Sequence, residues 1–494
     1  MGCGARRRRP PGRRRGQHRR RKMRRLTLIC LLSICGCSGR EAVREDYVFK
    51  PLEKPGESKA APAVGADLDS STPRTLDLLS AMRLAGAENL DIAIVETRLE
   101  ARRAGTDAAF SKYLPDLRLG FTALHHNGLR QAADSQVADQ PMRSFGAGPA
   151  VSLNLDPVEA RFQHLRALQI EDAAEHQARR TKAETVVHSA ILYLELVRAS
   201  GLVVVAGEAV ERSQAQVKLQ EGAAELQAEL GVELARARAE LSRDHEALLA
   251  ASGGLRQAGI NLATWLRLPP EVPLIPEARD IEPLTLVRAE REVADLLDAA
   301  LAASPDLAEM RALGRAAEEM KNAATWGPWT PDIFAAGSFG AYGGGPGGDS
   351  GSGFYEHGDR SDFAAGLSWT LRGMGLGDRA RVRRARAEAL EAGLQAARTR
   401  DRVSAEVVRG WTRSKNLLGR IEATRKGIEA AEETLKLVEA RFEAGDAIQL
   451  EVLEAIRAVA AARAALIDTT VSYNQTQHLL HYRVRGGSWR QSSR

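Results

Sequence analysis

The sequence contains an internal duplication, and this repeat restricts the folds that the chain can adopt. The segment YLPD at residues 113–116 recurs as WTPD at residues 329–332, 216 positions later. Ser152 in GPAVSLNL and Ser368 in AAGLSWTL have the same separation. Around both copies of these repeated segments, the sequence patterns predict one order of elements: a helix, two strands, a long helix, a glycine and a second long helix. Each half is therefore expected to supply one unit of a larger ring or bundle, and function to belong to that assembly rather than to a catalytic pocket.

The positive net charge of the chain comes from its first residues. The formal charge is +6, but residues 1–25 contain 13 arginines and lysines without any acid, and residues 26–36 contain no charged side chain. The remainder of the chain therefore has a formal charge of −7. A basic head on a mildly acidic body is typical of a targeting signal and argues against a nucleic-acid partner.

Residues 1–36 have the pattern of a secretory signal peptide, with Met23 as an alternative start. Arg24 and Arg25 precede an apolar run that ends in small residues and a cysteine. All four cysteines lie within residues 1–37, so no disulfide framework or thiol catalyst is expected in the body. The apolar run is shorter than the roughly 20 residues of a membrane-spanning helix, and no later segment is expected to reach that length. A membrane crossing would then require a β-barrel.

The body divides into two repeats. Residues 37–74 are rich in Pro, Glu, Ser and Ala and are expected to form a flexible tether. Residues 75–280 and 281–487 form the first and second repeats, and residues 488–494 form a tail. Apolar and polar residues alternate in four predicted strands, which lie near residues 117–122, 150–155, 333–339 and 363–371.

A glycine-rich segment lies within the second predicted strand pair. GGGPGG at residues 343–348 fits the dinucleotide pattern G-x-G-x-x-G, but that site requires a preceding strand and a following helix. Here the run falls in the middle of a predicted hairpin. We therefore expect the segment 340–361 to be a surface loop.

The helices of the second repeat carry a heptad seam. Apolar or small residues recur in alternating steps of four and three from Val403 to Phe442, and again from Ile448 to Leu480. This period predicts two antiparallel helices in coiled-coil contact, joined by a turn at Gly445. At ~1.5 Å per residue, the stretch 378–445 alone would reach ~100 Å. Many seam residues are small, which favours helices packed on both sides, as in a barrel wall made of helices.

These features together resemble the outer-membrane efflux protein (TolC-like) family, in its lipoprotein branch. The resemblance covers residues 75–487, and it rests on the order and duplication of YLPDLRLGF, WTPDIFAAGS, VSLNL, LSWTL, RFEAGDAIQLEVLEAIRAVAAARAAL and SYNQTQHLLHYRVRG. It implies a mainly α fold with a small β part. The long antiparallel coiled-coil helices would form a periplasmic α-barrel, and four strands per chain would contribute to a trimeric 12-stranded transmembrane β-barrel.

The resemblance implies an exit duct in the outer membrane. The homotrimer would pass substrates from an inner-membrane transporter and a periplasmic adaptor protein to the outside. A duct for type I protein secretion is the alternative, and a periplasmic adaptor lipoprotein or a structural coiled-coil lipoprotein fits less well. Both of the latter leave two hairpins, each preceded by a strand pair, unexplained. The substrate (drug, metal or protein) and the pump class stay open.

The resemblance also assigns residues. Cys37 in the lipobox-like run ICGC would be acylated, and Ser38 after it favours sorting to the outer membrane. Glu451 and Glu454 would ring the periplasmic mouth and favour cations. Gly222 and Gly445 would mark the hairpin tips where partners dock. Some family members carry a basic residue just after the last turn glycine, and this chain has Ala447 there instead.

No catalytic or metal motif is found. The sequence lacks H-E-x-x-H, a Walker A loop and a nucleophile elbow. His478 and His481 lie three residues apart on a predicted helix, but a pair without a third ligand is expected to consist of ordinary polar surface residues. We expect no enzymatic activity, no metal and no cofactor other than the lipid on Cys37.

Overall fold

The structure is a computed structural model that describes residues 73–131, 135–139, 141–226, 231–278, 281–346 and 356–486. All of these belong to one compact unit, residues 63–494. The predicted signal peptide, the lipid site Cys37, nearly all of the tether and the C-terminal tail lie outside the described residues.

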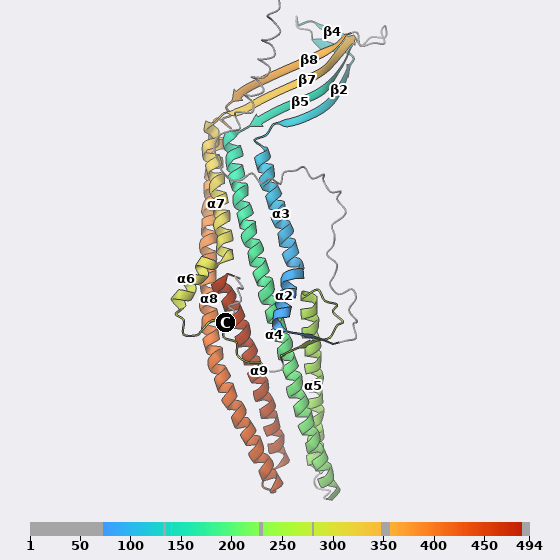
Figure 1. Cartoon of the computed structure of the whole chain (residues 1–494), viewed down its shortest axis with the longest axis vertical. Helices are drawn as coiled ribbons and strands as arrows, with labels where there is room; N and C mark the ends of the chain where they lie inside the picture. The colour runs from blue at the N-terminus through green and yellow to red at the C-terminus, as the bar shows by residue number, and fades with distance from the viewer. Residues whose placement is uncertain are drawn as a thin grey trace, which may run out of the picture. The chain divides into compact units, whose positions relative to one another are not determined.

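The described residues form mainly α-helices with a small β part, which confirms the predicted fold class (Figure 1). The helices are α2 (Leu78–Glu88), α3 (Leu90–Ser111), α4 (Pro157–Leu226), α5 (Gly231–Trp265), α6 (Val293–Ala303), α7 (Pro305–Trp326), the 3₁₀ helix η2 (Gly327–Trp329), α8 (Leu376–Glu443) and α9 (Gln449–Arg485). The strands are β1 (Arg74–Leu76), β2 (Asp116–His126), β3 (Leu129–Gln131), β4 (Val137–Asp139), β5 (Met142–Leu155), β6 (Leu274–Pro276), β7 (Asp332–Pro346) and β8 (Glu356–Ser368). Two helices, a long strand pair, a very long helix and a shorter helix follow one another in each half.

The main sheet is antiparallel and has two chemically different faces. Its order, β2-β5-β7-β8, sets the two strand pairs of the duplication side by side. One row of cross-strand neighbours is apolar: Leu117, Val151, Gly337 and Phe363. The next row lies on the opposite face and is polar at three of its four positions: Arg118, Ala150, Ser338 and Asp362. The apolar face is uncovered, and Phe363 is 81% exposed.

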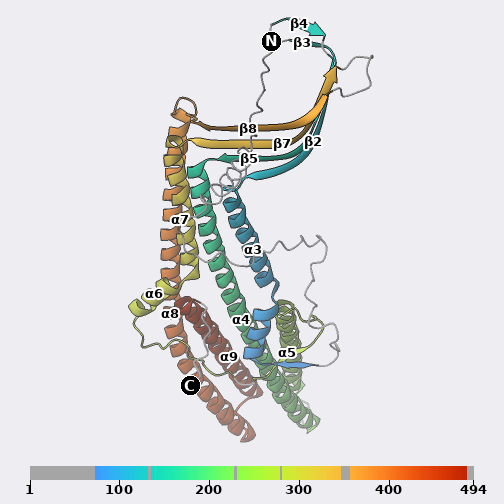
Figure 2. The same cartoon turned by 45° about the horizontal axis from the view of Figure 1, so that its top comes forward.

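The strands are longer than the sequence patterns predicted, and they curve along their length (Figure 2). The predicted loop at 340–361 is wrong at both ends, because β7 continues to Pro346 and β8 already begins at Glu356. Glycine has a low intrinsic strand propensity, but the neighbouring strand β5 supplies hydrogen-bond partners that override it. A Cβ atom at Gly148 or at Gly340 would collide with the backbone of the facing strand, so glycine permits the close approach of β5 and β7.

Four helices meet the sheet at one level. Helix α3 ends just before β2, α4 begins just after β5, α7 ends before β7, and α8 begins after β8. The C-terminal ends of α4 and α8 lie at the other ends of these long helices, beside the first turns of α5 and α9 (Figure 1). With 70 and 68 residues, α4 and α8 are each ~100 Å long.

The predicted heptad seam between α8 and α9 is confirmed. In α8 the buried seam positions are Val403, Val407, Ser414, Leu417, Ile421 and Leu435. In α9 they are Val452, Ala455, Val459, Thr469, Tyr473, Thr476 and Leu480. These residues are separated by three or four positions, or by sums of such steps, so each helix buries one stripe against the other.

One helix differs from the prediction for membrane spans. Helix α4 contains a stretch that is long and apolar enough to cross a membrane by length and composition, contrary to the expectation that no later segment would be. Its residues Tyr193, Leu196 and Val197 pack in a core with Leu76 and Leu262. Only 33% of the apolar stretch is buried, and the core residues named above pack against other helices and the short parallel pair β1–β6.

Candidate gate at the helical hairpin tips

The turn between α8 and α9 is built around Gly445. This glycine has a φ of +82°, and its N–H donates to the carbonyl oxygen of Phe442 at 3.0 Å. The N–H of Asp446 donates to the carbonyl oxygen of Arg441 at 2.9 Å. The two bonds form a Schellman motif, which closes α8 and requires a left-handed residue at this position. The structure therefore places a tight turn at Gly445, as the sequence predicted.

The first hairpin turn does not lie at Gly222. Gly222 lies inside helix α4, which continues to Leu226; α5 begins at Gly231, and residues 227–230 lie outside the described residues. The prediction placed the turn too early because it relied on a glycine. A single glycine costs a helix only about 1 kcal/mol, and the Ala-Ala-Glu-Leu segment that follows favours a helix.

The two predicted gate carboxylates have different surroundings. The Glu451 carboxylate accepts a hydrogen bond from Arg441 Nη1 at 3.3 Å, across the turn of the same hairpin. Arg441 Nη2 also donates to the carbonyl oxygen of Asp446 at 2.8 Å. Glu454 is exposed and has no ion-pair partner within the described part of the chain. Glu454 therefore lacks a direct ion pair in that part of the chain, although it lies close enough to Arg457 for their charges to interact, whereas Glu451 is paired with Arg441.

An ion pair between a buried carboxylate and a half-exposed arginine joins the two hairpins near their tips. Glu240 on α5 is 3% exposed, and both of its carboxylate oxygens accept hydrogen bonds from the guanidinium of Arg457 on α9. Arg243 adds a contact at 2.5 Å. Hydrogen bonding to Arg457 is the main reason that the pKa of Glu240 lies below its ordinary value. Sequence reasoning missed this pair, although the 217 positions between its members nearly equal the length of the duplication.

Two buried glutamines make a second link. Gln220 Nε2 on α4 donates to Gln449 Oε1 on α9 at 2.9 Å, and Gln449 Nε2 donates to Gln216 Oε1 at 3.2 Å. Farther from the tips, Arg463 on α9 contacts Glu208 on α4 and Glu432 on α8. These polar contacts hold the two hairpins of one chain side by side. Any separation of the tips must break them.

A known protein family matches part of this chain. The model for outer membrane efflux proteins matches residues 296–481, which is most of the second repeat. Over these residues the chain belongs to the outer membrane efflux protein family. It is an outer-membrane efflux channel, as the resemblance implied, and the prediction that it is a transport protein rather than an enzyme is confirmed.

Solved structures share the fold of this efflux protein at low sequence identity. A membrane protein from Pseudomonas aeruginosa has a TM-score of 0.72 and 20% identity, over 83% of this chain and 90% of that chain. The CmeC outer membrane channel of Campylobacter jejuni has a TM-score of 0.71 and 16% identity, over 84% and 87%. The outer membrane protein VceC of Vibrio cholerae has a TM-score of 0.69 and 20% identity, over 83% and 96%. No curated protein matches the chain.

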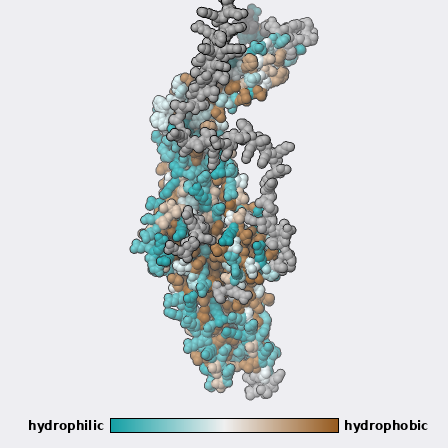
Figure 3. Space-filling view, viewed as in Figure 1, coloured by the Kyte–Doolittle hydropathy of each residue, from teal (hydrophilic) through white to brown (hydrophobic). Residues whose placement is uncertain are grey.

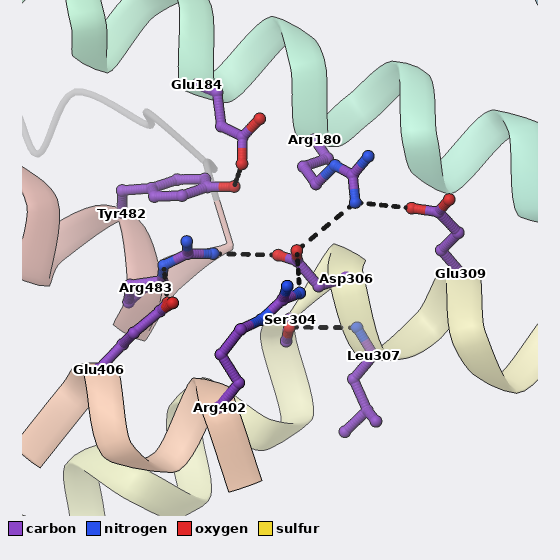
Figure 4. Close-up of polar contacts among 10 residues, drawn as sticks. All are labelled: Arg180, Glu184, Ser304, Asp306, Leu307, Glu309, Arg402, Glu406, Tyr482 and Arg483. Atoms are coloured by element: carbon purple, nitrogen blue, oxygen red, sulfur yellow. Dashed lines mark hydrogen bonds and ion pairs between the residues drawn. The ribbon is translucent and has the colours of Figure 1, made fainter. Parts of the chain in front are cut away.

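A second polar cluster ties four helices of the efflux protein together (Figure 4). Asp306 begins α7, and its carboxylate, 6% exposed, receives Arg483 at 3.0 Å, Arg402 at 3.2 Å and Arg180 at 3.5 Å. Arg180 also binds Glu309 at 2.9 Å, where burial raises the pKa of that carboxyl. The three arginines come from α4, α8 and α9, so this carboxylate joins both repeats.

The SYNQTQ motif of α9 holds the segment that connects the two repeats. Asn474 Oδ1 accepts the N–H of Leu284 at 2.7 Å, and Asn474 Nδ2 donates to the carbonyl oxygen of Glu282 at 2.9 Å. Gln477 Oε1 accepts the N–H of Val287 at 2.8 Å. The side-chain amides replace the backbone partners that an irregular segment lacks. The sequence showed the motif but not this role.

One histidine of the predicted pair does not lie where the sequence placed it. His478 is 2% exposed, and burial lowers its pKa to about 4, so the description of it as a polar surface residue was wrong. Its neighbours on α9 face the core, and the helix period therefore buries it as well. No group of three His, Cys, Asp or Glu side chains suited to a metal occurs among the described residues.

Proposed function

We propose that three copies of this efflux protein form one exit duct through the outer membrane. The observation that carries the proposal is the four-stranded sheet, whose apolar face is uncovered and whose edge strands are β2 and β8. Four strands are too few to close a barrel, which needs about eight, and an open edge is unfavourable in lipid. Three copies would supply twelve strands. The long hairpins would then form an α-helical tunnel in the periplasm.

The apolar face of the sheet would contact lipid. Figure 3 shows hydrophobic residues on the sheet beside a helical surface that is largely hydrophilic near it. The polar row with Arg118, Ser338 and Asp362 would face the lumen. This distribution follows the rule for transmembrane barrels, in which residues alternate between lipid and interior.

The hairpin tips would be the gate and the docking site. A periplasmic adaptor protein would bind the tips, at Gly445 and at the end of α4 near Gly222, and would connect the duct to an inner-membrane transporter. Glu454 from three chains would surround the opening and concentrate cations there. Glu451 would add to this charge only when Arg441 moves away from it.

The N-terminus would be held in the membrane by a lipid on Cys37, the only covalent group that we propose. Metabolic labelling with an alkyne fatty acid tests this step. The wild-type protein should be labelled and the Cys37→Ser variant should not, with Cys35→Ser as the matched control. Equal labelling of the wild-type and Cys37→Ser proteins would show that Cys37 is not the acylated residue.

The pump class separates an efflux duct from the alternative, a duct for type I protein secretion. Chemical crosslinking in cells and purification on a C-terminal tag would capture the partners. Recovery of an adaptor with a proton-driven transporter would support efflux of drugs or metal ions. Recovery of an ATP-driven exporter would support protein secretion. Absence of self-crosslinked trimers would overturn the proposal.

A further inference from the structure

The turn between β8 and α8 is a strained structure with large exposed side chains. Gly373, Met374 and Gly375 all have positive φ, at 58°, 58° and 85°. Asp378 holds the turn, because its carboxylate accepts the Arg372 N–H at 2.9 Å and also contacts the Arg372 guanidinium. Left-handed backbone is unfavourable for methionine, yet Met374 is kept there and is 94% exposed. Moving an apolar side chain of this size out of water lowers the free energy.

Other apolar side chains surround this turn. Three of the six tryptophans of the chain, Trp326, Trp329 and Trp369, lie at this level and are more than half exposed. Leu371 and Leu376 flank the turn and are also exposed. Tryptophan is enriched at membrane–water interfaces. If the sheet spans the outer membrane, as proposed above, this level is the periplasmic interface.

Three arginines form one stripe beside these apolar residues. Arg379, Arg383 and Arg386 are spaced by four and three residues on α8, so they share one face of the helix. Their neighbours Arg381 and Arg384 pair with carboxylates. The three stripe arginines are exposed and make no ion pair with any described residue. Their positive charge is available to a ligand.

The stripe and the apolar residues line one cavity of about 740 Å³. Trp329, Leu371 and Leu376 contribute to its wall together with the three arginines. Among the described residues, Asp378 is the only acid that lines it, and that carboxylate already binds Arg372. The cavity therefore combines an apolar part with three guanidinium groups whose charge is not compensated.

We propose that this cavity binds an anionic phospholipid of the inner leaflet of the outer membrane. The phosphate lies against Arg379, Arg383 and Arg386, and an acyl chain covers Trp329, Leu371 and Leu376. Guanidinium groups bind phosphate oxygens through charge-assisted hydrogen bonds, and clustered arginines next to a membrane recognise anionic head groups. A phospholipid matches both parts of the cavity in one molecule. The proposal rests on the proposed function for the orientation of the sheet.

The test counts lipids on the whole channel. The purified protein is placed in nanodiscs of phosphatidylcholine with a minor fraction of phosphatidylglycerol, and the lipids that remain bound after release are counted by native mass spectrometry. The test variant is R379Q/R383Q/R386Q. The control variant is R413Q/R420Q/R425Q, which removes the same charge from exposed positions of the same helix that also make no ion pair among the described residues.

The wild-type and control proteins should retain phosphatidylglycerol, and the test variant should retain at least about tenfold less, because each arginine contributes to head-group binding. Where the triple variant does not assemble, Arg383→Gln alone should lower retention about fivefold. Equal retention by test variant and control would overturn the proposal. Displacement of the lipid by millimolar inorganic phosphate would assign the cavity to a free anion instead.

A second copy of the chain is the competing occupant. Loss of trimers in the test variant with unchanged lipid per chain would show that the cavity is a subunit contact, and would overturn the lipid site. The same mass spectra give the oligomeric state, which tests the proposed function separately from the lipid site. A wild-type protein that is monomeric would contradict the trimeric duct, and its lipid count would still decide the lipid site.

Discussion

At the scale of single residues, two buried carboxylates show how this channel keeps charge inside its helical body. Glu240 is held by Arg457 from the other hairpin, and Asp306 is held by three arginines from three helices. A buried charge without its partner costs several kcal/mol, so each carboxylate is stable only while the helices that supply the arginines stay close. The two sites are therefore the points at which a single substitution should act on the packing of whole helices.

Arg457→Ala should loosen the hairpin tips. The substitution leaves Glu240 buried with only the contact from Arg243, and it should destabilise the contact between hairpins by about 3 kcal/mol. In planar bilayers the variant should show a higher open probability than the wild-type channel. Arg236→Ala is the control, because Arg236 forms an exposed pair with Glu233 on the same helix. Identical gating of the Arg457→Ala and wild-type channels would mean that this pair does not hold the tips.

Acid should weaken the same contact. The pKa of Glu240 is lowered in the folded protein. The stabilisation that the ionised carboxylate gives to the contact between the hairpins is therefore complete above the ordinary pKa of 4.5, and it is lost as the pH falls through the lower pKa of the folded protein. Channel openings of the wild-type protein should therefore increase as the pH is taken below 4.5. The Glu240→Gln channel lacks this titration, and its openings should change less over the same pH range. Parallel pH profiles of the two channels would assign the effect to other groups.

At the scale of elements, the sequence was a good guide to what repeats locally and a poor guide to contacts between distant segments. The seam from Val403 to Leu480 and the alternation in the four strands follow from side-chain period, so they were predicted. The prediction of a turn at Gly222 was wrong because an α-helix can continue through a single glycine. The burial of His478 and the pairing of Glu240 with Arg457 depend on neighbours far away in the chain, which no local pattern specifies.

The two glycines assigned to tips should respond in opposite ways to alanine. Gly222 lies inside α4, where alanine should stabilise the protein by about 0.5–1 kcal/mol. Gly445 has a φ of +82°, where alanine should destabilise it by about 1–2 kcal/mol. Thermal unfolding of both variants in detergent measures the difference. If Gly222→Ala instead destabilised the protein, the first turn would lie at Gly222 after all.

Gln477→Leu should release the segment that connects the repeats. The substitution removes the acceptor for the N–H groups of Leu286 and Val287, and each buried donor left without a partner costs about 1–3 kcal/mol. Trypsin should then cut faster after Arg288 and Arg291, which follow this segment. Gln395→Leu, an exposed change on α8, serves as the control. Unchanged cleavage in the Gln477→Leu protein would show that the amide does not hold the segment.

At the scale of the whole molecule, the charge at the tips matters only in the assembled duct. One Glu454 in a single chain is an ordinary exposed carboxylate, but three around one opening add their potentials where the pore is narrow. The ion pair between Arg441 and Glu451 then becomes a way to vary this field, because it withholds one carboxylate per chain from the opening. Ion selectivity should therefore depend on Arg441 as well as on the acids.

Two substitutions should move the selectivity in opposite directions. Glu454→Gln removes the free carboxylate from each chain and should lower the preference for K⁺ over Cl⁻. Arg441→Gln frees Glu451 and should raise that preference, since three copies together gain three uncompensated negative charges. The reversal potential across a KCl gradient in planar bilayers measures both effects, and the shifts should shrink at high salt because the charges are screened. Arg413→Gln, far from the tips on α8, should leave the potential unchanged. If Glu454→Gln had no effect while Arg441→Gln still raised the preference, Glu451 alone would line the opening; if neither shifted the potential, the tips would not be the selective part of the duct.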